Sequence, residues 1–406
     1  MKPKIVVVGA GAAGFFAAIH AAENRNYDVI LIEKMNKFLS KVKISGGGRC
    51  NVTNACSQIS ELSKNYPRGE KFLKKAFQYF YTKDTVEWFE NRGVMLKTEP
   101  DNRIFPVTND SQTIVDILEK ERKKQNIQLL LSAELEKISI NSKEDFVIKI
   151  KNQHDIIAEK VIITTGGSPK TENLDWIKNF GNHTIIPCLP SLFTFNMPKN
   201  DVLHLQGVAA NAAQARIQGT NLVTNGAILI THWGMSGPAI LRLSAWGARI
   251  LAEKNYDFVV AIQWIAEKKA NDWQQDFEEW KNSNKQMKNV WVDLPKRLWI
   301  FLLEKANIDI DKKVNDLKKS EQNKLIELLT NDTYKVTGKT TFKEEFVTCG
   351  GVSLDDVDYN TMESKKVKNL FFAGEILDID GITGGFNFQS AWTTGFLAGK
   401  NASEKK

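Results

Sequence analysis

The segment that most constrains the fold of this chain is a strand, a glycine-rich turn and a helix at its beginning. Residues 5–8 (IVVV) form a continuous apolar run, typical of a central parallel strand that is buried on both faces. The turn 9–14 (GAGAAG) follows at once, and an alanine-rich helical pattern extends to about Glu23. A second strand pattern, 28–32, ends at Glu33, an acidic residue about 20 positions beyond the turn. This order predicts a βαβ unit that binds a dinucleotide.

The residues of the turn have separate physical roles in such a unit. Gly9 permits the tight turn, Gly11 lets the backbone approach a pyrophosphate, and Gly14 lets the helix and the strand pack closely. The helix N-terminus near Ala12 supplies unpaired N–H groups and a positive dipole end to the phosphates. Glu33 is expected to accept hydrogen bonds from both ribose hydroxyls and to repel a 2′-phosphate.

The segments that follow distinguish an FAD domain from a simple NAD dehydrogenase. Helical patterns cover 70–91 and 111–126, and strand patterns cover 129–140, 145–151 and 156–164. Turn-forming residues separate these strands. The pattern predicts a hairpin meander that returns the chain to the parallel sheet. This order is typical of FAD domains. The chain has no second GxGxxG turn, so we expect no dedicated nicotinamide-nucleotide domain.

The middle of the chain reads as an insertion. Residues 192–231 have short alternating segments broken by glycine and asparagine, which favours a small β-barrel or sheet. Residues 264–330 have helical spacing with many lysines and tryptophans, and sheet-like sequence resumes at Phe346, with a strand at 369–373 and a last helix at 387–400. The expected domains are an FAD-binding domain at 1–190 and 345–406, an inserted barrel-like domain at 191–263 and 331–344, and a helical subdomain at 264–330.

Composition limits the partners and the compartment. The net charge of +7, from 55 basic and 48 acidic residues, is mild, and the lysines are spread along the chain, so nucleic acid is not favoured as a partner. Four scattered cysteines do not form a secreted disulfide framework. The N-terminal apolar run is shorter than the roughly 7 to 15 residues of a signal peptide, and no stretch reaches the roughly 18 of a membrane span. We expect a cytoplasmic protein with no membrane contact, of undetermined oligomeric state.

Five motifs in matching order resemble one family of bacterial flavoproteins over nearly the whole chain. The motifs are GAGAAG (9–14), SGGGRCNVTN (45–54), THWGMSGPAIL (231–241), VTCGGVSL (347–354) and FFAGEILDIDGITGGFNFQSAW (371–392). They are similar to those of the aminoacetone oxidase and BaiN-like family. The resemblance implies an α/β fold with a glutathione-reductase-like, FAD-binding Rossmann domain built from both chain ends, plus an inserted β-barrel and a small helical subdomain. Family members are linked to amine oxidation and to enone reduction.

One segment departs from the family pattern. Members usually carry a loop of the form TGDGY after the returning strand, whereas residues 164–181 (TTGGSPKTENLDWIKNFG) are shorter and lack it. Contacts that this loop makes in relatives are therefore not carried over to this chain.

The C-terminal motif predicts contacts with the flavin. Gly374 and Glu375 end a strand beside the phosphate loop, where similar flavoproteins use an acidic residue near the ribityl and phosphate groups. Residues 384–387 (GGFN) open the last helix, whose N–H groups are placed to face the pyrimidine edge, where negative charge gathers on reduction. Asp378 and Asp380 flank this site without an assignable role.

The THWGMSGPAIL motif supplies a candidate acid/base. Ser236 is a plausible N-cap with Pro238 in the first helical turn. His232, beside Trp233 on a loop, is the preferred candidate for proton transfer while hydride moves at the flavin N5. A histidine that only hydrogen-bonds within the loop explains the sequence as well.

Two cysteines near the second family motif raise the alternative of a redox disulfide. Disulfide reductases separate such a pair by four residues on a helix, whereas Cys50 and Cys56 are separated by five, with Asn and Thr between them. The family likeness includes Arg49, Cys50 and Asn51 but not Cys56, so we interpret the stretch as a flavin cradle. Arg49 and Cys50 are also candidate catalytic residues, the latter as a reactive thiol.

The residues that we predict to contact FAD are Gly9, Gly11, Ala12, Ala13, Gly14, Glu33, Lys34, Lys41, Ser45, Gly46, Gly47, Arg49, Cys50, Asn51, Thr53, Asn54, Leu135, Thr165, Gly166, Gly374, Glu375, Gly384, Gly385, Phe386 and Asn387.

These features predict an FAD-dependent oxidoreductase that moves hydride between the flavin and a small organic substrate, by amine or aminoketone oxidation or by enone reduction. NAD(P)H is a candidate transient co-substrate, and the choice between oxidase and reductase stays open. The alternative is a flavin-carrying binding or regulatory protein that contacts nucleic acid or protein through the lysine-rich insert at 268–288 and 312–324. An NAD-binding dehydrogenase is disfavoured by the meander.

Overall fold

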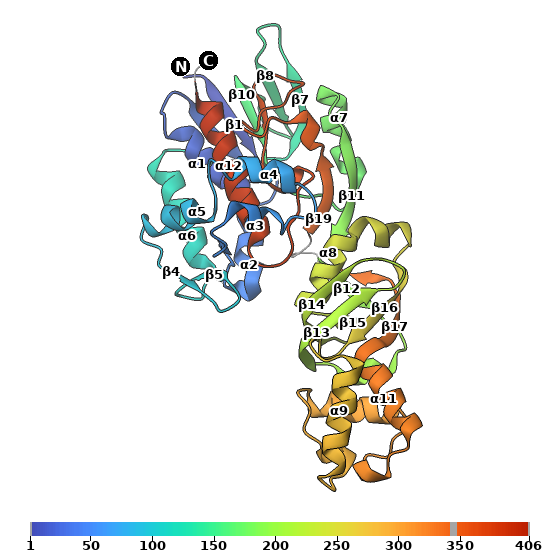
Figure 1. The fold of residues 1–406 in the computed structure, drawn as a ribbon. Helices are drawn as coiled ribbons and strands as arrows, with labels where there is room; N and C mark the ends of the chain where they lie inside the picture. Colours follow the sequence, from blue (N-terminus) through green and yellow to red (C-terminus); the bar gives the residue numbers. More distant parts are fainter. Residues whose placement is uncertain (1, 342–346, 405–406) are drawn as a thin grey trace. The chain divides into compact units, whose positions relative to one another are not determined.

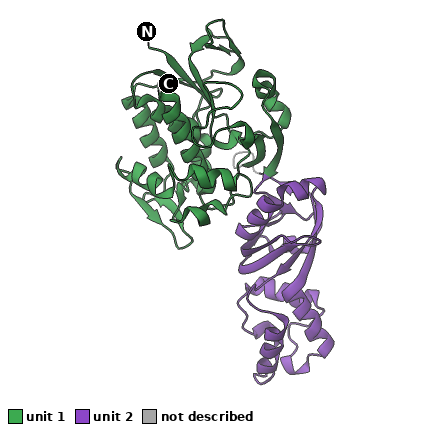
Figure 2. Ribbon diagram, turned by 45° about the horizontal axis from the view of Figure 1, so that its top comes forward, with its two compact units in different colours: residues 1–190, 343–406 green, residues 191–342 purple. Residues whose placement is uncertain are grey.

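The chain divides into two compact units. The computed structural model describes residues 2–341 and 347–404. Unit 1 comprises residues 1–190 and 343–406, and unit 2 comprises residues 191–342 (Figure 2). The domain boundary that we expected between residues 344 and 345 lies outside the described residues. No helix within the described ranges is both long and apolar enough to span a bilayer.

A five-stranded parallel sheet forms the centre of unit 1 (Figure 1). Its order is β20-β10-β1-β2-β6, with β1 at Lys4–Val8, β2 at Asp28–Ile32, β6 at Gln128–Leu130, β10 at Lys160–Ile163 and β20 at Leu370–Phe372. In register, Val8 at the end of β1 lies between Ile32 of β2 and Ile163 of β10. The carboxyl ends of three strands therefore meet at the glycine-rich turn. The predicted βαβ unit and returning strand are confirmed.

The first and last helices pack against each other beside this sheet. They are α1 (Ala12–Ala22) and α12 (Phe386–Ser403), which Figure 1 shows side by side. Gly395 and Gly399 of α12 lie against the backbone of Ala13 and Ala17, where an added Cβ would be 2.7 Å and 2.2 Å from the carbonyl oxygens. Small residues on both helices thus permit the close approach that joins the two chain ends into one domain.

Smaller elements complete unit 1. The helices are α2 (Ser40–Gly48), α3 (Ile59–Ser63), α4 (Glu70–Ala76), α5 (Thr82–Glu90), α6 (Gln112–Lys124) and α7 (Asp175–Gly181). The meander consists of β7 (Leu135–Ile140), β8 (Phe146–Ile150) and β9 (Ile156–Ala158). A separate three-stranded sheet consists of β3 (Thr53–Asn54), β4 (Leu96–Thr98) and β5 (Arg103–Pro106). The short 3₁₀ helices of unit 1 are η1 (Thr171–Leu174), η5 (Leu354–Asp356) and η6 (Gly374–Ile376), and those of unit 2 are η2 (Asp201–Leu205), η3 (Met287–Asn289) and η4 (Val314–Asp316).

Two predicted segments are each divided in the structure. The helical pattern 70–91 forms α4 and α5, because the carboxylate of Asp84 accepts a hydrogen bond from the N–H of Tyr81, at 2.8 Å, and starts a new helix. The strand pattern 129–140 forms β6 and β7, which are separated by a turn in which Ser132 has a φ of 52°. Side-chain periodicity continues across both breaks, so it did not reveal them.

The inserted β-domain is a barrel that closes on a single glycine. Its strands are β12 (Thr194–Asn196), β13 (Ala209–Ile217), β14 (Val223–Ile230), β15 (Gly234–Ser236), β16 (Asp257–Gln263), β17 (Asp332–Thr337) and β18 (Lys339–Thr340), in the order β17-β16-β13-β14-β15-β12-β18. Only Gly338 separates β17 from β18, and its φ is 106°. Its N–H donates to Tyr256 on one side and its carbonyl accepts from Asn196 on the other. One bent segment therefore pairs with both ends of the sheet, as the barrel prediction requires.

The helices of unit 2 share one hydrophobic core with the barrel. They are α8 (Pro238–Glu253), α9 (Ala270–Lys281), α10 (Lys296–Lys305) and α11 (Lys319–Asn331). The core extends from Phe258 in the barrel through Trp264 to Leu302 in α10. Asp332, which is buried directly after α11, pairs with Lys305 at 2.6 Å and accepts a hydrogen bond from the Trp264 ring at 3.1 Å. The separate helical subdomain that we expected is therefore part of one compact unit with the barrel.

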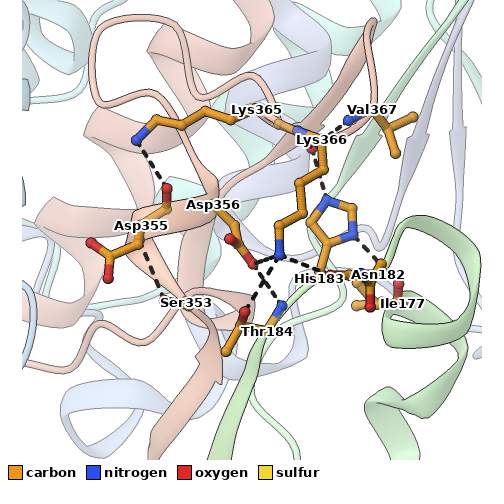
Figure 3. A network of polar contacts seen from close by, with 11 residues as sticks. Ile177, Asn182, His183, Thr184, Ser353, Asp355, Asp356, Lys365, Lys366 and Val367 are labelled. Carbon is orange, nitrogen blue, oxygen red and sulfur yellow. Dashed lines mark hydrogen bonds and ion pairs between the residues drawn. The ribbon is translucent and has the colours of Figure 1, made fainter.

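A two-stranded ribbon, β11 (Ile185–Ser191) and β19 (Val347–Val352), leads out of unit 1. A polar network holds the base of this ribbon (Figure 3). Asp356 accepts hydrogen bonds from the N–H of Thr184 at 2.6 Å and from Lys366 at 2.8 Å. The buried His183 ring lies 2.8 Å from the hydroxyl of Ser364. Burial lowers the pKa of His183, so this ring is held in its neutral form.

Candidate functional site

The glycine-rich turn has the geometry of a phosphate-binding loop. Gly9 has a φ of 106°, and an added Cβ would lie 2.5 Å from the carbonyl oxygen of Thr164. At Gly14 the added Cβ would lie 1.8 Å from the carbonyl oxygen of Gly9, whereas at Gly11 it would meet nothing within 4 Å. Two glycines therefore serve close packing, and the third faces open space at the N-terminus of α1. A pyrophosphate fits this arrangement because its oxygens need room against exposed N–H groups.

Glu33 lies at the end of β2, beside this loop. Its carboxylate accepts hydrogen bonds from the N–H of Ala10 at 2.9 Å and of Met35 at 3.0 Å. The carbonyl of Glu33 accepts from the N–H of Ala133 at 2.8 Å, which brings the start of β7, with Leu135, to the same edge. This grouping suits an adenosine, with the carboxylate toward the ribose. The exposed Lys34 follows Glu33 directly.

A salt bridge brings two separately predicted residues together next to the loop. Lys41 in α2 pairs with Glu375 at 2.7 Å, and the other carboxylate oxygen of Glu375 accepts from the N–H of Thr348 at 2.8 Å. Gly374 has a φ of 78°, and an added Cβ would lie 2.7 Å from the Cβ of Ala13. Residues 374–375 therefore lie against the N-terminus of α1. Thr165 and Gly166, at the end of β10, are predicted to contact the same ligand.

The SGGGRCN segment leaves its helix at Ser45 and continues through three glycines. Ser45 has extended backbone angles within α2, and its hydroxyl donates to the carbonyl of Val42 at 2.9 Å. Gly46, Gly47 and Gly48 have φ values of 59°, 69° and 82°. Added Cβ atoms at Gly47 and Gly48 would meet nothing within 4 Å. The backbone is therefore exposed along this turn, as a cradle for a ligand requires.

Arg49 is held by protein groups on two sides. Its guanidinium lies 4.1 Å from the centre of the Phe105 ring and 2.7 Å from the carboxylate of Glu99. The Arg49 side chain remains partly exposed. A catalytic or flavin contact by Arg49 stays a prediction, and such a contact would use the N–H groups that Glu99 does not engage.

Cys50 is unsuited to the role of a reactive thiol. It is 0% exposed, and burial raises its pKa to about 12 against the opposing hydrogen bond with Ser45. The thiol is therefore protonated at neutral pH, whereas nucleophilic cysteines act as thiolates. Cys50 and Cys56 are both free thiols. We infer that Cys50 serves as packing beneath the cradle.

Two asparagines fasten this cradle to the loop that precedes α12, and a third joins that loop to the start of α12. Asn51, with its amide oriented to complement its neighbours, accepts from the N–H of Gly385 at 2.8 Å. Asn54 donates to the carbonyl of Gly384 at 3.0 Å. Asn387 bonds both the N–H and the carbonyl of Gly381, at 2.9 and 3.0 Å. These amides are satisfied by backbone groups, so their contribution to a cofactor is to hold the loop in position.

The glycine pair before α12 allows this close approach. Gly385 has a φ of 90°, and an added Cβ would lie 2.5 Å from the carbonyl oxygen of Thr53. The ring of Phe386 is buried against Gly384. Phe386 therefore offers its backbone, not its ring, to a ligand at the N-terminus of α12. Two motifs that are far apart in the sequence meet at this point.

His232 belongs to unit 2. Its ring centre lies 4.6 Å from that of Trp233, and both side chains are exposed. The expectation that Ser236 caps α8 was wrong: Ser236 ends β15 and its hydroxyl accepts from Thr194 at 3.1 Å, while Gly237, with a φ of 93°, precedes the helix. Pro238 begins α8 as expected. The acid/base role of His232 stays a prediction.

One residue pair beside the site went unrecognised in the sequence. Arg68 forms an ion pair with Asp380, and both are buried. Asp380 is visible within the last family motif, but Arg68 lies 312 positions away and carries no motif of its own. A pairing of this kind follows from the fold alone.

Comparisons with known proteins agree with this geometry. A family model described as HI0933-like protein Rossmann domain matches residues 3–401. The chain is 27% identical to a 3-dehydro-bile acid delta(4,6)-reductase of Clostridium scindens, over 99% of both chains. It is 30% identical to a ribosomal RNA dihydrouridine synthase of Escherichia coli, over 98% of this chain and 97% of that protein.

A solved structure supports the fold. The 3-ketosteroid-delta4-(5alpha)-dehydrogenase of Rhodococcus jostii RHA1 superposes with a TM-score of 0.53 over 100% of this chain and 97% of that one, at 12% identity. At this identity the likeness bears on the fold alone. Together with the family match, this likeness confirms the predicted α/β, Rossmann-type FAD fold.

Proposed function

The chain belongs to the HI0933-like family of FAD-dependent oxidoreductases, and from this premise we propose that it reduces a carbon–carbon double bond conjugated with a carbonyl group. The family assignment confirms the predicted enzyme class and the predicted cofactor, FAD. It disfavours the alternative of a flavin-carrying regulatory protein without catalysis.

The observation that carries this proposal is the chemistry common to two full-length relatives. A 3-keto steroid with 4,6-unsaturation and a uracil ring both hold a double bond in conjugation with a carbonyl. In each case saturation needs a hydride at the carbon remote from the carbonyl and a proton at the carbon next to it. One arrangement of a hydride source and an acid can therefore serve both substrates.

Between these substrates we favour a uracil base within an RNA. The relative that acts on ribosomal RNA has the higher identity, 30% against 27%, over nearly the full length of both chains. The net charge of +7 is mild, so it is compatible with an RNA partner but does not select one. This proposal replaces our sequence-based preference for a small free substrate and against nucleic acid.

The residues that would hold FAD are those of the two groups described above. The phosphate loop with Gly11 would take the pyrophosphate, Glu33 the ribose, and the cradle with residues 384–387 the ring. FAD, when bound, supplies a ring that accepts and donates hydride. The N-terminus of the 18-residue α12 favours negative charge near it.

The chain supplies the proton for the reduction, and a separate reductant supplies the two electrons. We assign to a ring nitrogen of His232 the proton that the substrate carbon gains. The two electrons come from a reduced nicotinamide nucleotide, NADH or NADPH, which loses one hydride for each substrate double bond reduced. A cytoplasmic site of action belongs to the same proposal, and the four free cysteines support it.

The experiment uses the purified protein with FAD under anaerobic conditions. NADH or NADPH is expected to bleach the visible flavin absorbance, and a uridine-containing ribosomal RNA transcript is expected to restore it while gaining two hydrogen atoms per modified base. The matched control is the same transcript with 5,6-dihydrouridine in place of uridine.

The other outcomes decide between the remaining substrates. Reoxidation by 4-androstene-3,17-dione, but not by RNA, would retain the reductase and reject the RNA substrate. Bleaching of the oxidised flavin by a primary amine, without any response to NADH or NADPH, would reject the reductase in favour of an amine oxidase.

A further inference from the structure

An ion pair between Arg68 and Asp380 is buried at the loop 379–386, which leads into α12. Asp380 is 0% exposed and Arg68 is 9% exposed. Two nitrogens of the guanidinium, Nε and Nη2, donate to the two carboxylate oxygens, so the pair has the bidentate geometry. The backbones of the same two residues also form an antiparallel bridge. A buried pair of this kind costs desolvation and is weak evidence for a stabilising role, so its presence calls for another explanation.

Other contacts from the same stretch reach the same loop. The carbonyl of Asn65 accepts from the N–H of Ile382 at 2.9 Å. The hydroxyl of Tyr66, which is fully buried, donates to the carbonyl of Phe386 at 2.7 Å. An added Cβ at Gly69 would lie 2.7 Å from the side chain of Ile379. Residues 65–69 therefore follow the loop 379–386 along its length.

The opposite side of this loop is held by the cradle. Asn54 bonds the carbonyl of Gly384, and Asn51 bonds the N–H of Gly385. The loop that leads into α12 is thus fixed between residues 65–69 and residues 51–54. All of these contacts except the ion pair are between neutral groups. Among these contacts with the loop, the charged groups are Arg68 and Asp380.

We propose that Arg68 and Asp380 are positioning residues for FAD: they hold the loop before α12 in place and keep that region electrically neutral, so that the helix N-terminus sets the local field at the flavin. This inference rests on the site's binding FAD, and it does not depend on which substrate is reduced. Its tests use FAD affinity and flavin midpoint potential, which are measured without a substrate.

The proposal predicts shifts of opposite sign. Asp380→Asn leaves the Arg68 cation without its partner, which favours the electron-rich reduced flavin and raises the midpoint potential. Arg68→Gln leaves the Asp380 carboxylate without its partner, which disfavours reduction and lowers the midpoint potential. The double variant, with two neutral residues of similar size, is expected to have a potential near that of the unaltered protein. Both single variants are expected to bind FAD about tenfold more weakly, because the loop loses its anchor.

The control is an ion pair in unit 2 between the buried Asp332 and Lys305, whose side chain is partly exposed. Asp332→Asn is expected to lower stability in urea without shifting the flavin potential. Equal shifts for the two single variants, or no shift in either, would overturn the proposal in favour of a purely structural pair.

A conservative variant keeps the proposal testable if a single variant fails to retain FAD. Arg68→Lys keeps the positive charge but loses the bidentate geometry. The expected result is an unchanged midpoint potential with weaker FAD binding. Unchanged FAD affinity, or a fall in potential like that of Arg68→Gln, would count against the proposal.

Discussion

Two alanine substitutions in the phosphate loop should have separable effects, one on stability and one on FAD binding. At Gly14 the added Cβ would lie 1.8 Å from the carbonyl oxygen of Gly9 and 2.7 Å from the Thr164 hydroxyl. An ordinary contact begins near 3.4 Å, so α1 would have to move by about 1.5 Å from the turn. Overpacking of this kind costs about 1–3 kcal/mol, and we expect Gly14→Ala to lie at the upper end, near ~3 kcal/mol.

Gly11→Ala is expected to affect FAD binding and not stability. Its added Cβ would meet nothing within 4 Å, and its φ of −88° and ψ of −167° suit any residue. A poorer helix cap and a less flexible unfolded chain act in opposite directions, so the unfolding free energy should change by less than about 1 kcal/mol. The methyl group would instead occupy the space that the pyrophosphate needs. FAD affinity should therefore fall about 100-fold, which is about 2.7 kcal/mol.

The assays separate the two effects. Urea unfolding of each FAD-free variant measures stability, and quenching of FAD fluorescence on titration measures affinity. We expect Gly14→Ala to lose both properties and Gly11→Ala to lose affinity alone. Normal FAD affinity in Gly11→Ala would refute the placement of the pyrophosphate over this turn, whatever the result at Gly14.

Three further predictions concern other residues of unit 1. Iodoacetamide at neutral pH should leave Cys50 unmodified in the native protein while labelling it after unfolding, because burial raises its pKa to about 12; peptide mapping checks this, and native labelling of Cys50 would contradict it. Burial lowers the pKa of His183, so its contribution to stability is complete above its unfolded pKa of about 6.5 and is lost as pH falls through the lower folded value. The thermal midpoint should therefore fall more between about pH 7 and pH 5 in the unaltered protein than in His183→Gln, and parallel curves would count against this assignment. Glu375→Gln breaks a partly exposed pair with Lys41 and should weaken FAD binding about fivefold, in line with about 1 kcal/mol for such pairs; an unchanged titration would show that the pair lies away from the cofactor.

Local patterns in the sequence were sufficient for the main features of the fold. The run at residues 5–8, the turn 9–14 and Glu33 predict the βαβ unit because each depends on neighbours within one short segment. The returning strand and the last helix follow from the same kind of pattern. The resemblance of five motifs added the FAD fold and the insertion, and the family match agrees with it.

Where contacts between distant segments determine a residue's role or burial, the same local patterns gave no prediction or a wrong one. Ser236 has the residue type of a helix cap, but pairing of β15 with β12 places it in a strand. Cys50 looks available in a glycine-rich loop, yet the fold covers it completely. In both cases the outcome depends on segments that the local sequence does not contain.

The sequence by itself determined that the chain would build a dinucleotide-binding unit, because glycines at fixed spacing are required by backbone geometry that acts over a few residues. Only the tertiary structure decided how that unit is completed. It closes the barrel at Gly338, and it pairs Arg68 with Asp380 across 312 positions. Such pairs form when distant segments are brought together by burial of apolar surface, which is non-directional, so the local sequence does not specify which segments will meet.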